Sequence, residues 1–97
     1  MPTYVSLIRF TDQGIRNVKD VAGRIAAVEK LLDQVGARFT ELYLTMGRYD
    51  YVAVIEAPDD ETATKAVLAV SSLGNVRSET MRAYARPEIR KIISGLP

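Results

Sequence analysis

The chain of 97 residues is 47% hydrophobic and 26% charged, and its 13 basic and 12 acidic residues leave a formal net charge of +1. This length predicts a single domain over residues 1–97 with a small core, and the balanced charge argues against a dedicated nucleic-acid binder. Cysteine and histidine are both absent, which excludes disulfides, thiolate metal sites, histidine general bases and a histidine ligand to haem. We therefore expect no metal and no cofactor.

Apolar stretches in the sequence are far shorter than the roughly 20 residues that a helix needs to cross a bilayer. The first four residues, Met-Pro-Thr-Tyr, do not begin a basic segment followed by an apolar run, so we expect no signal peptide, a cytoplasmic location and no membrane partner. A small domain without disulfides or metals often gains stability from another subunit. This is a first indication of a homo-oligomer.

The first half of the chain predicts a strand followed by a helix. Residues Tyr4 to Phe10 are rich in β-branched and aromatic types, which favours a strand. From Ile15 to Val35 apolar residues recur every three or four positions, which predicts one helix that ends at Gly36. Gly23 is unfavourable inside a helix, so we expect another part of the chain to pack closely against it.

The rest of the chain predicts a hairpin, a second long helix, a fourth strand and a terminal helix. The hairpin strands are residues 38–46 and 49–56, joined by a tight turn at Gly47-Arg48. Asp59 is a suitable N-cap for a helix that extends to about Leu73. Residues 76–84 predict the last strand, and Pro87 is suited to the first turn of a short amphipathic helix.

This order of elements predicts an α+β, ferredoxin-like fold with a βαββαβ core. Right-handed crossovers then give a four-stranded antiparallel sheet with the two long helices on one face, followed by a short C-terminal helix.

Side chains alternate between the two faces of a strand, so a two-residue turn at Gly47-Arg48 assigns each hairpin residue to one face. One face carries Leu42, Leu44, Met46, Tyr49, Tyr51, Ala53 and Ile55, and the other carries Phe39, Glu41, Tyr43, Thr45, Asp50, Val52, Val54 and Glu56. The first set suits a floor beneath the helices. The second set is still too apolar for a face open to water, so we expect another copy of the sheet to cover it in a dimeric α/β barrel.

The segment Gly47-Arg48-Tyr49-Asp50 matches the Gly-x-Tyr-Asp signature of the GYD-domain family, and the chain resembles that family over nearly its whole length. Further matching segments are Phe10-Thr11-Asp12-Gln13-Gly14, Tyr43, Glu56-Ala57-Pro58-Asp59 and Leu73-Gly74-Asn75-Val76-Arg77. The resemblance implies a dimeric α+β barrel. The wider set of such barrels includes small monooxygenases, haem-using enzymes and amino-acid-sensing regulators, so it implies no one activity.

The signature has a structural explanation that we weigh above a functional one. Gly47 permits a positive φ at the turn, Tyr49 packs at the start of a strand, and Asp50 accepts backbone N–H bonds around the hairpin. A role for Asp50 in contacting a ligand is the alternative.

A small organic molecule bound between two sheets is the first functional hypothesis, because ligand sites combine apolar walls with a few convergent polar groups. The candidate ligand-binding residues are Tyr43, Asp50, Arg9, Glu41 and Arg82, with Glu79 as an alternative to Arg82. The competing interpretation is that these charges pair with one another at the rim of a dimer interface, which makes the protein an interaction module.

Three other functions remain open on the sequence alone. A cofactor-independent monooxygenase or isomerase would use a tyrosine or carboxylate base in an apolar barrel. A purely structural or regulatory oligomer is also possible, although the chain has no room for a DNA-binding segment. The segment Arg48-Tyr49-Asp50-Tyr51-Val52 loosely resembles an RNA-stacking strand, but Asp50 would place negative charge on the stacking surface, so RNA binding is the remotest alternative.

Overall fold

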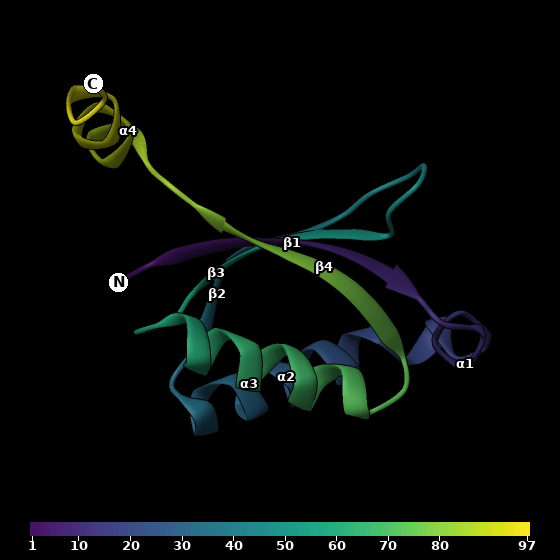
Figure 1. The fold of residues 1–97 in the computed structure, drawn as a ribbon. Coiled ribbons are helices and arrows are strands. Elements are labelled where there is room, and N and C mark those ends of the chain that lie inside the picture. Colours follow the sequence, from purple (N-terminus) through teal and green to yellow (C-terminus); the bar gives the residue numbers. More distant parts are fainter.

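The computed structural model describes residues 1–97, which fold into one four-stranded sheet with helices (Figure 1). In chain order the elements are β1 (Thr3–Phe10), α1 (Asp12–Arg16), the 3-10 turn η1 (Val18–Asp20), α2 (Val21–Val35), β2 (Arg38–Leu44), β3 (Tyr51–Glu56), α3 (Asp60–Ser72), β4 (Val76–Ala83) and α4 (Arg86–Ser94).

The sheet is antiparallel throughout, with strand order β2-β3-β1-β4. α2 and α3 pack side by side beneath one face of the sheet, and no helix of the same chain covers the other face (Figure 1). This arrangement confirms the predicted α+β, ferredoxin-like fold.

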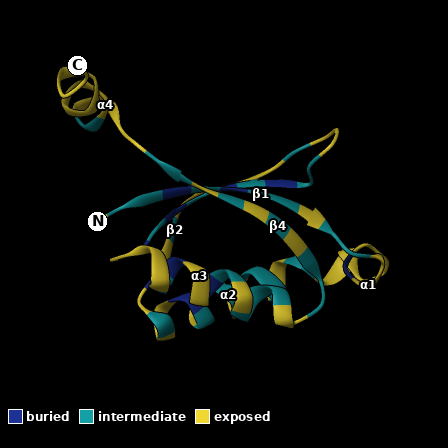
Figure 2. Ribbon diagram, in the orientation of Figure 1, coloured by how far each residue is buried: buried dark blue, intermediate teal, exposed yellow.

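The core lies between the sheet and these two helices (Figure 2). The side chains of Tyr51, Ala53 and Ile55 are buried on the helix side of β3, as alternation along the strand predicts. Alanines supply much of this core, and only 11 of the 97 residues are buried. A core this small leaves little margin of stability for an isolated chain.

The predicted helix over residues 15–35 is broken in the structure. α1 begins after Thr11, whose hydroxyl accepts a hydrogen bond from the Gly14 amide at 3.1 Å, and η1 separates it from α2. Gly14 permits the close approach of α1 to the α3–β4 connection, because a Cβ there would lie 2.0 Å from the carbonyl oxygen of Asn75. This contact holds α1 beside the start of β4, off the axis of α2. The prediction that another part of the chain packs closely against Gly23 is wrong, because a Cβ there would meet nothing within 4 Å.

The hairpin has the predicted register but a longer loop than predicted. Leu44 pairs with Tyr51, which is the same register as Met46 opposite Tyr49. The strands stop there, and residues 45–50 form a loop in which Asp50 bonds with β1 and with Thr45, the residue after β2. The Asp50 amide donates to the Ile8 carbonyl at 2.8 Å, and the Asp50 carbonyl accepts from the Thr45 amide at 2.8 Å.

A β-bulge changes the face of one predicted residue. The β2–β3 register shifts between Phe39 and Glu41, so that Phe39 pairs with Ile55. Phe39 therefore packs against the core beneath the sheet, and its predicted place on the other face is wrong. The extra residue is Thr40, whose hydroxyl lies 3.3 Å from the Val54 carbonyl.

α4 stands apart from the rest of the fold (Figure 1). The end of β4 carries it away from the sheet, and no other helix or strand packs extensively against it. Its apolar side chains Ile89, Ile92 and Ile93 are exposed. None of the helices combines the length and the apolar character that a membrane span requires.

We expect Gly47→Val to destabilise the protein, because Gly47 has a φ of +101° that a β-branched residue adopts only with strain. A Cβ at this position would meet no atom within 4 Å, so the cost comes from the backbone alone and is about 1–2 kcal/mol. Thermal unfolding measures it. Gly23→Ala is the control, expected to be more stable than the wild type by about 0.5–1 kcal/mol. An unchanged melting temperature for Gly47→Val would contradict this assignment.

Candidate functional site

The candidate site is the sheet face that α2 and α3 leave uncovered, called here the open face. The strand registers place on it Thr3, Val5, Leu7 and Arg9 of β1, Glu41 and Tyr43 of β2, Val52, Val54 and Glu56 of β3, and Arg77, Glu79, Met81 and Ala83 of β4. Its apolar side chains are only partly shielded: Met81 is 48% exposed and Tyr43 is 55% exposed. An apolar surface rimmed by charges is typical of an interaction site.

Three of the five predicted ligand-binding residues, Arg9, Glu41 and Tyr43, lie on the open face. The Tyr43 hydroxyl donates to a Glu41 carboxylate oxygen at 3.0 Å, and this bond with the nearby carboxylate charge raises the pKa of Tyr43. Asp50 lies at the end of the hairpin. Arg82 is on the opposite, helix-facing side of β4, so the structure does not bring the five residues together.

Asp50 joins the signature loop to the first strand. One carboxylate oxygen accepts a hydrogen bond from the Phe10 amide at 2.8 Å, in addition to the two backbone bonds described above. The side chain thus takes the place of a backbone carbonyl where the β1–β3 pairing ends. This geometry agrees with the structural interpretation of the signature.

Tyr49 lies over the open face, on the side opposite to the predicted one. Its hydroxyl lies 3.2 Å from a Glu79 carboxylate oxygen, and its ring lies beneath the Arg9 guanidinium, whose carbon is 4.7 Å from the ring centre. Arg9 also donates to the Arg48 carbonyl at 3.3 Å. Glu79, rather than Arg82, is therefore the β4 residue that approaches Arg9. These partially exposed contacts fix the signature loop over one end of the open face.

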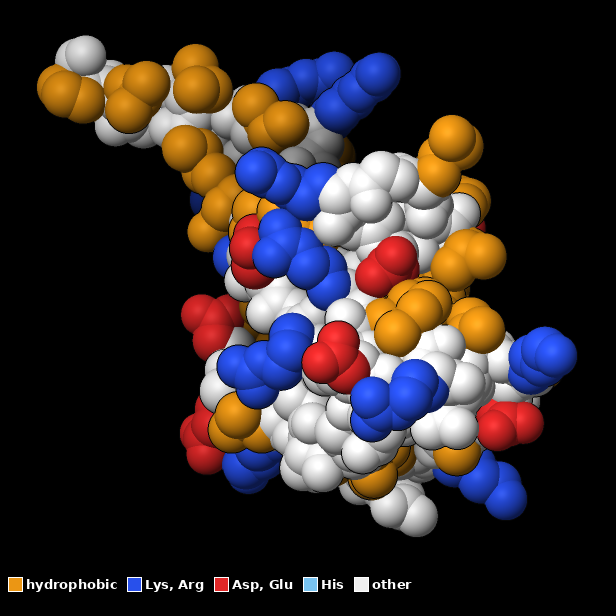
Figure 3. All heavy atoms as spheres, turned by 90° about the vertical axis from the view of Figure 1, so that its right-hand side faces the viewer, with side chains coloured by type: hydrophobic (Ala, Val, Ile, Leu, Met, Phe, Trp, Pro, Cys, Tyr) orange, Lys and Arg blue, Asp and Glu red, His pale blue; other side chains and the backbone are white.

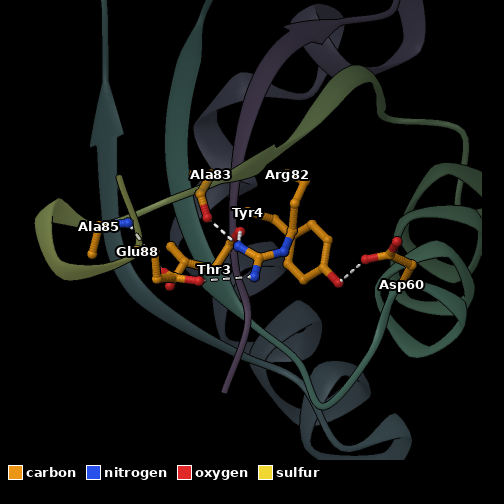
Figure 4. A network of polar contacts seen from close by, with 7 residues as sticks. All are labelled: Thr3, Tyr4, Asp60, Arg82, Ala83, Ala85 and Glu88. Carbon is orange, nitrogen blue, oxygen red and sulfur yellow. Dashed lines mark hydrogen bonds and ion pairs between the residues drawn. The ribbon is translucent and has the colours of Figure 1, made fainter. Parts of the chain in front are cut away.

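Arg82 is part of a different network, at the other end of β4 (Figure 4). Its guanidinium donates to the carbonyl of Thr3 at 3.2 Å and to that of Ala83, and it forms an ion pair with Glu88 at 3.2 Å. A second Glu88 oxygen accepts from the Ala85 amide at 3.1 Å. The hydrogen bond from the Ala85 amide, together with Arg82, holds the pKa of Glu88 below its ordinary value. Arg82 therefore anchors the first turn of α4.

Tyr4 extends this network toward the helices (Figure 4). The Tyr4 ring is 4% exposed, and its hydroxyl donates to an Asp60 carboxylate oxygen at 2.5 Å. Burial and the contact with Asp60 raise the pKa of Tyr4 to about 12. Sequence reasoning places neither residue in a site. The only signal for the pair is a tyrosine in an otherwise apolar strand and an acidic residue at a helix start.

α4 forms a second exposed apolar surface (Figure 3). In that view the terminal segment stands out from the body, with hydrophobic side chains along its length and basic side chains gathered on one side. Ile93 is 58% exposed, and Tyr84 and Leu96 near the two ends of the helix are also exposed. An amphipathic helix normally buries such a stripe, so α4 needs a surface beyond those that its own chain supplies.

The fold shifts the pKa of one group on the open face, Tyr43, and of four groups outside it. The pKa shifts that the fold imposes raise those of Tyr4, Tyr43 and Tyr51 and lower those of Asp59 and Glu88. All of these shifts lead away from neutrality, whereas a general base or acid works best with a pKa near the operating pH. The resolved shifts therefore give no support to an acid–base site.

A family model for the GYD domain matches residues 4–93. The chain belongs to the GYD-domain family. Over 84 residues it is 36% identical to a protein of Thermus thermophilus named glutamine synthetase and cystathionine beta-lyase binding protein, and the match covers 86% of this chain and 88% of the relative. The resemblance that the signature and its flanking segments indicated is thereby confirmed.

Two solved structures share the fold. A crystal structure of a Thermus thermophilus protein, 30% identical, superposes with a TM-score of 0.56 and covers 89% of this chain and 100% of that one. The feast or famine regulatory protein of M. tuberculosis, complexed with L-methionine, gives a TM-score of 0.64 at 14% identity, over 89% of this chain and 54% of that one. At that identity the second likeness concerns the fold alone.

We expect Tyr4 to make stability depend on alkaline pH. Because the pKa of Tyr4 is raised from 10.0 to about 12, the folded state favours the neutral phenol. The contribution of the neutral Tyr4 phenol to the free energy of unfolding is complete below pH 10 and is lost as the pH rises from 10 through 12. Between these values, the free energy of unfolding should therefore fall more steeply in the wild type than in Tyr4→Phe. Urea titrations at stepped pH measure the slopes, with the exposed Tyr84→Phe as control. Equal slopes for wild type and Tyr4→Phe would overturn the assignment.

Proposed function

We propose that this chain is a protein-binding module that works as a homodimer, with the open faces of two copies in contact. The observation that carries the proposal is that the chain covers only one side of a sheet with apolar side chains on both sides. Val5, Leu7, Val52 and Val54 form the centre of the uncovered side. Removing these side chains from water favours association.

The open face is large enough for a small interface, and α4 can add to it. A face four strands wide and about seven residues long covers roughly 450 Å² at about 4.8 Å per strand and 3.3 Å per residue. Two such faces together present about 900 Å² in projection, which suits an interface at the small end of the roughly 1,200–2,000 Å² of accessible surface that stable interfaces bury. The exposed stripe of α4, with Ile89, Ile92 and Ile93, supplies further apolar area if it packs on the partner copy.

The charges at the rim suit two copies related by a two-fold axis. Arg9, Arg77 and Glu79 lie at one end of the open face, and Glu41 lies on β2 at its opposite edge. Both signs are present on the same surface, so each copy offers partners for the other. Exposed charge pairs of this kind contribute to register more than to affinity.

A small-molecule site between the two sheets is less well supported. Arg82 is engaged with Thr3, Ala83 and Glu88 on the far side of β4, and Asp50 is engaged with the Phe10 amide. Two of the five predicted ligand-binding residues, Arg82 and Asp50, therefore have structural contacts instead. The alternative, a cofactor-independent enzyme, is not supported by the pKa shifts described above, because all of them lead away from neutrality.

We further propose that the dimer binds an enzyme of amino-acid metabolism. The support is the named Thermus thermophilus relative, which is similar over most of both chains. In a face-to-face dimer the outer surfaces of α2 and α3 stay free, so enzyme binding does not compete with dimerisation.

We expect Val52→Lys to convert the dimer into monomers, because the substitution places a charge at the centre of an apolar contact. Val52 lies on the open face of a central strand, so the fold of the monomer should survive. Light scattering after gel filtration gives the mass. Leu68→Lys, on the exposed side of α3, is the control and should remain a dimer. A Val52→Lys variant with the mass of the wild type would show that this face is not the interface.

We expect the wild-type protein to bind glutamine synthetase or cystathionine beta-lyase purified from its own organism. Biolayer interferometry with the immobilised dimer would give saturable binding of at least one enzyme. Val52→Lys should bind at least about tenfold more weakly, because a dimer on a multi-subunit enzyme gains from avidity. Absence of binding to both enzymes would reject this partner class and leave the dimer proposal standing.

A further inference from the structure

A cavity of about 110 Å³ lies on the other side of the sheet, between the sheet and the two long helices. Its walls come from all four strands, α2, α3 and the α3–β4 connection, and 11 of its 13 lining residues are hydrophobic. An apolar cavity of about 150 Å³ is large enough to bind benzene. At about 110 Å³ this cavity is smaller than that one, and it has room for a short branched chain.

Arg24 is the one charged residue in the cavity wall. Its Nη2 donates to the Gly14 carbonyl at 3.1 Å, which fixes the guanidinium in place, and its carbon lies 5.9 Å from the centre of the Phe10 ring. Its Nη1 is buried and has no hydrogen-bond partner. A buried donor without an acceptor costs free energy, and the cost is larger for a charged group.

The surroundings of Arg24 offer this nitrogen no carboxylate. The other polar residue of the wall is Asn75, whose side-chain oxygen already accepts from Gln13 at 3.0 Å. Tyr51 is the remaining titratable group of the wall; burial raises its pKa, and the Arg24 charge opposes that effect. The wall is thus apolar, and its one charged side chain has a buried nitrogen without an acceptor.

We infer that this cavity binds a small monocarboxylate with an apolar group of about four to five carbon atoms, its carboxylate accepting from Arg24. The apolar group fills the space beside Phe10, Tyr51 and Val28. This site is separate from the open face, because Tyr51 points toward the helices and its neighbour Val52 points away from them. The dimer and this site are therefore tested independently of each other.

The test uses two carboxylates, 3-methylbutanoate and 4-methylpentanoate, and their neutral amides, 3-methylbutanamide and 4-methylpentanamide. Titration of the full-length protein, followed by ¹H–¹⁵N NMR, reports on the amides of Phe10 and Tyr51 and gives dissociation constants. We expect saturable shifts with at least one carboxylate and binding at least about tenfold weaker for its amide, since a charge-assisted hydrogen bond is lost.

Two variants test whether Arg24 supplies the charge that binds the carboxylate. Arg24→Met keeps the apolar stem and should weaken carboxylate binding at least about tenfold, whereas Lys30→Met, an exposed position of the same helix, should leave it unchanged. Arg24→Gln replaces Arg24→Met if the latter does not fold, and the comparison of acid with amide needs no variant. Equal binding of acid and amide, unchanged binding by the Arg24 variant, no shifts with either carboxylate, or equal binding of inorganic phosphate would each overturn the inference.

Discussion

The structure depends on one constraint: two helices cover one face of a sheet that is apolar on both faces. β3 is the clearest example of a strand with apolar side chains on both faces. Tyr51, Ala53 and Ile55 are buried beneath it, and Val52 and Val54 alternate with them on the uncovered side. A parallel sheet solves this problem with helices on both faces. This chain places its third substantial helix, α4, on an arm beyond β4, where it covers neither face. The missing cover is therefore expected from outside the chain.

The sequence predicts the elements and their order well, because each has a local signal. Asp59 caps α3 by accepting from the Thr62 amide at 2.7 Å, Gly36 and Gly74 have positive φ values at helix ends, and the hairpin register matches the alternation of its side chains. These features depend on a few neighbouring residues. They can therefore be inferred without knowledge of the tertiary structure.

The errors concern residues whose position depends on distant contacts. Phe39 changes face because one extra residue enters β2 as a bulge, and no pattern in the strand marks it. Tyr49 changes face because the strand stops before it and its ring meets Arg9 and Glu79. α1 is a separate helix beside the distant α3–β4 connection, where the backbone of Asn75 leaves no room for a side chain at position 14. Arg82 falls outside the predicted set because the hairpin does not fix which residues of β4 face the helices.

Arg24 is absent from the predicted site residues, although the sequence contains a signal for it. It falls between Val21 and Val28 at helical spacing and next to Ile25, so a charged residue occupies the apolar stripe of α2. A charge in that position requires either a partner or an exit to water. The partner that the fold supplies, the Gly14 carbonyl, satisfies one nitrogen and leaves the other without an acceptor.

The signature loop and the cavity are joined through the end of β1. Asp50 accepts a hydrogen bond from the Phe10 amide at the end of the strand. The Phe10 ring meets the Tyr51 ring edge-on, at 5.3 Å between centres, at the wall of the cavity beneath the sheet. Tyr49, next to Asp50, lies over the open face at the same point. Three consecutive residues thus contact the open face, the strand end and the cavity wall. This connection between the two surfaces depends on the Asp50 carboxylate oxygen that accepts from the Phe10 amide, which is a physical reason for an acidic residue to follow the tyrosine.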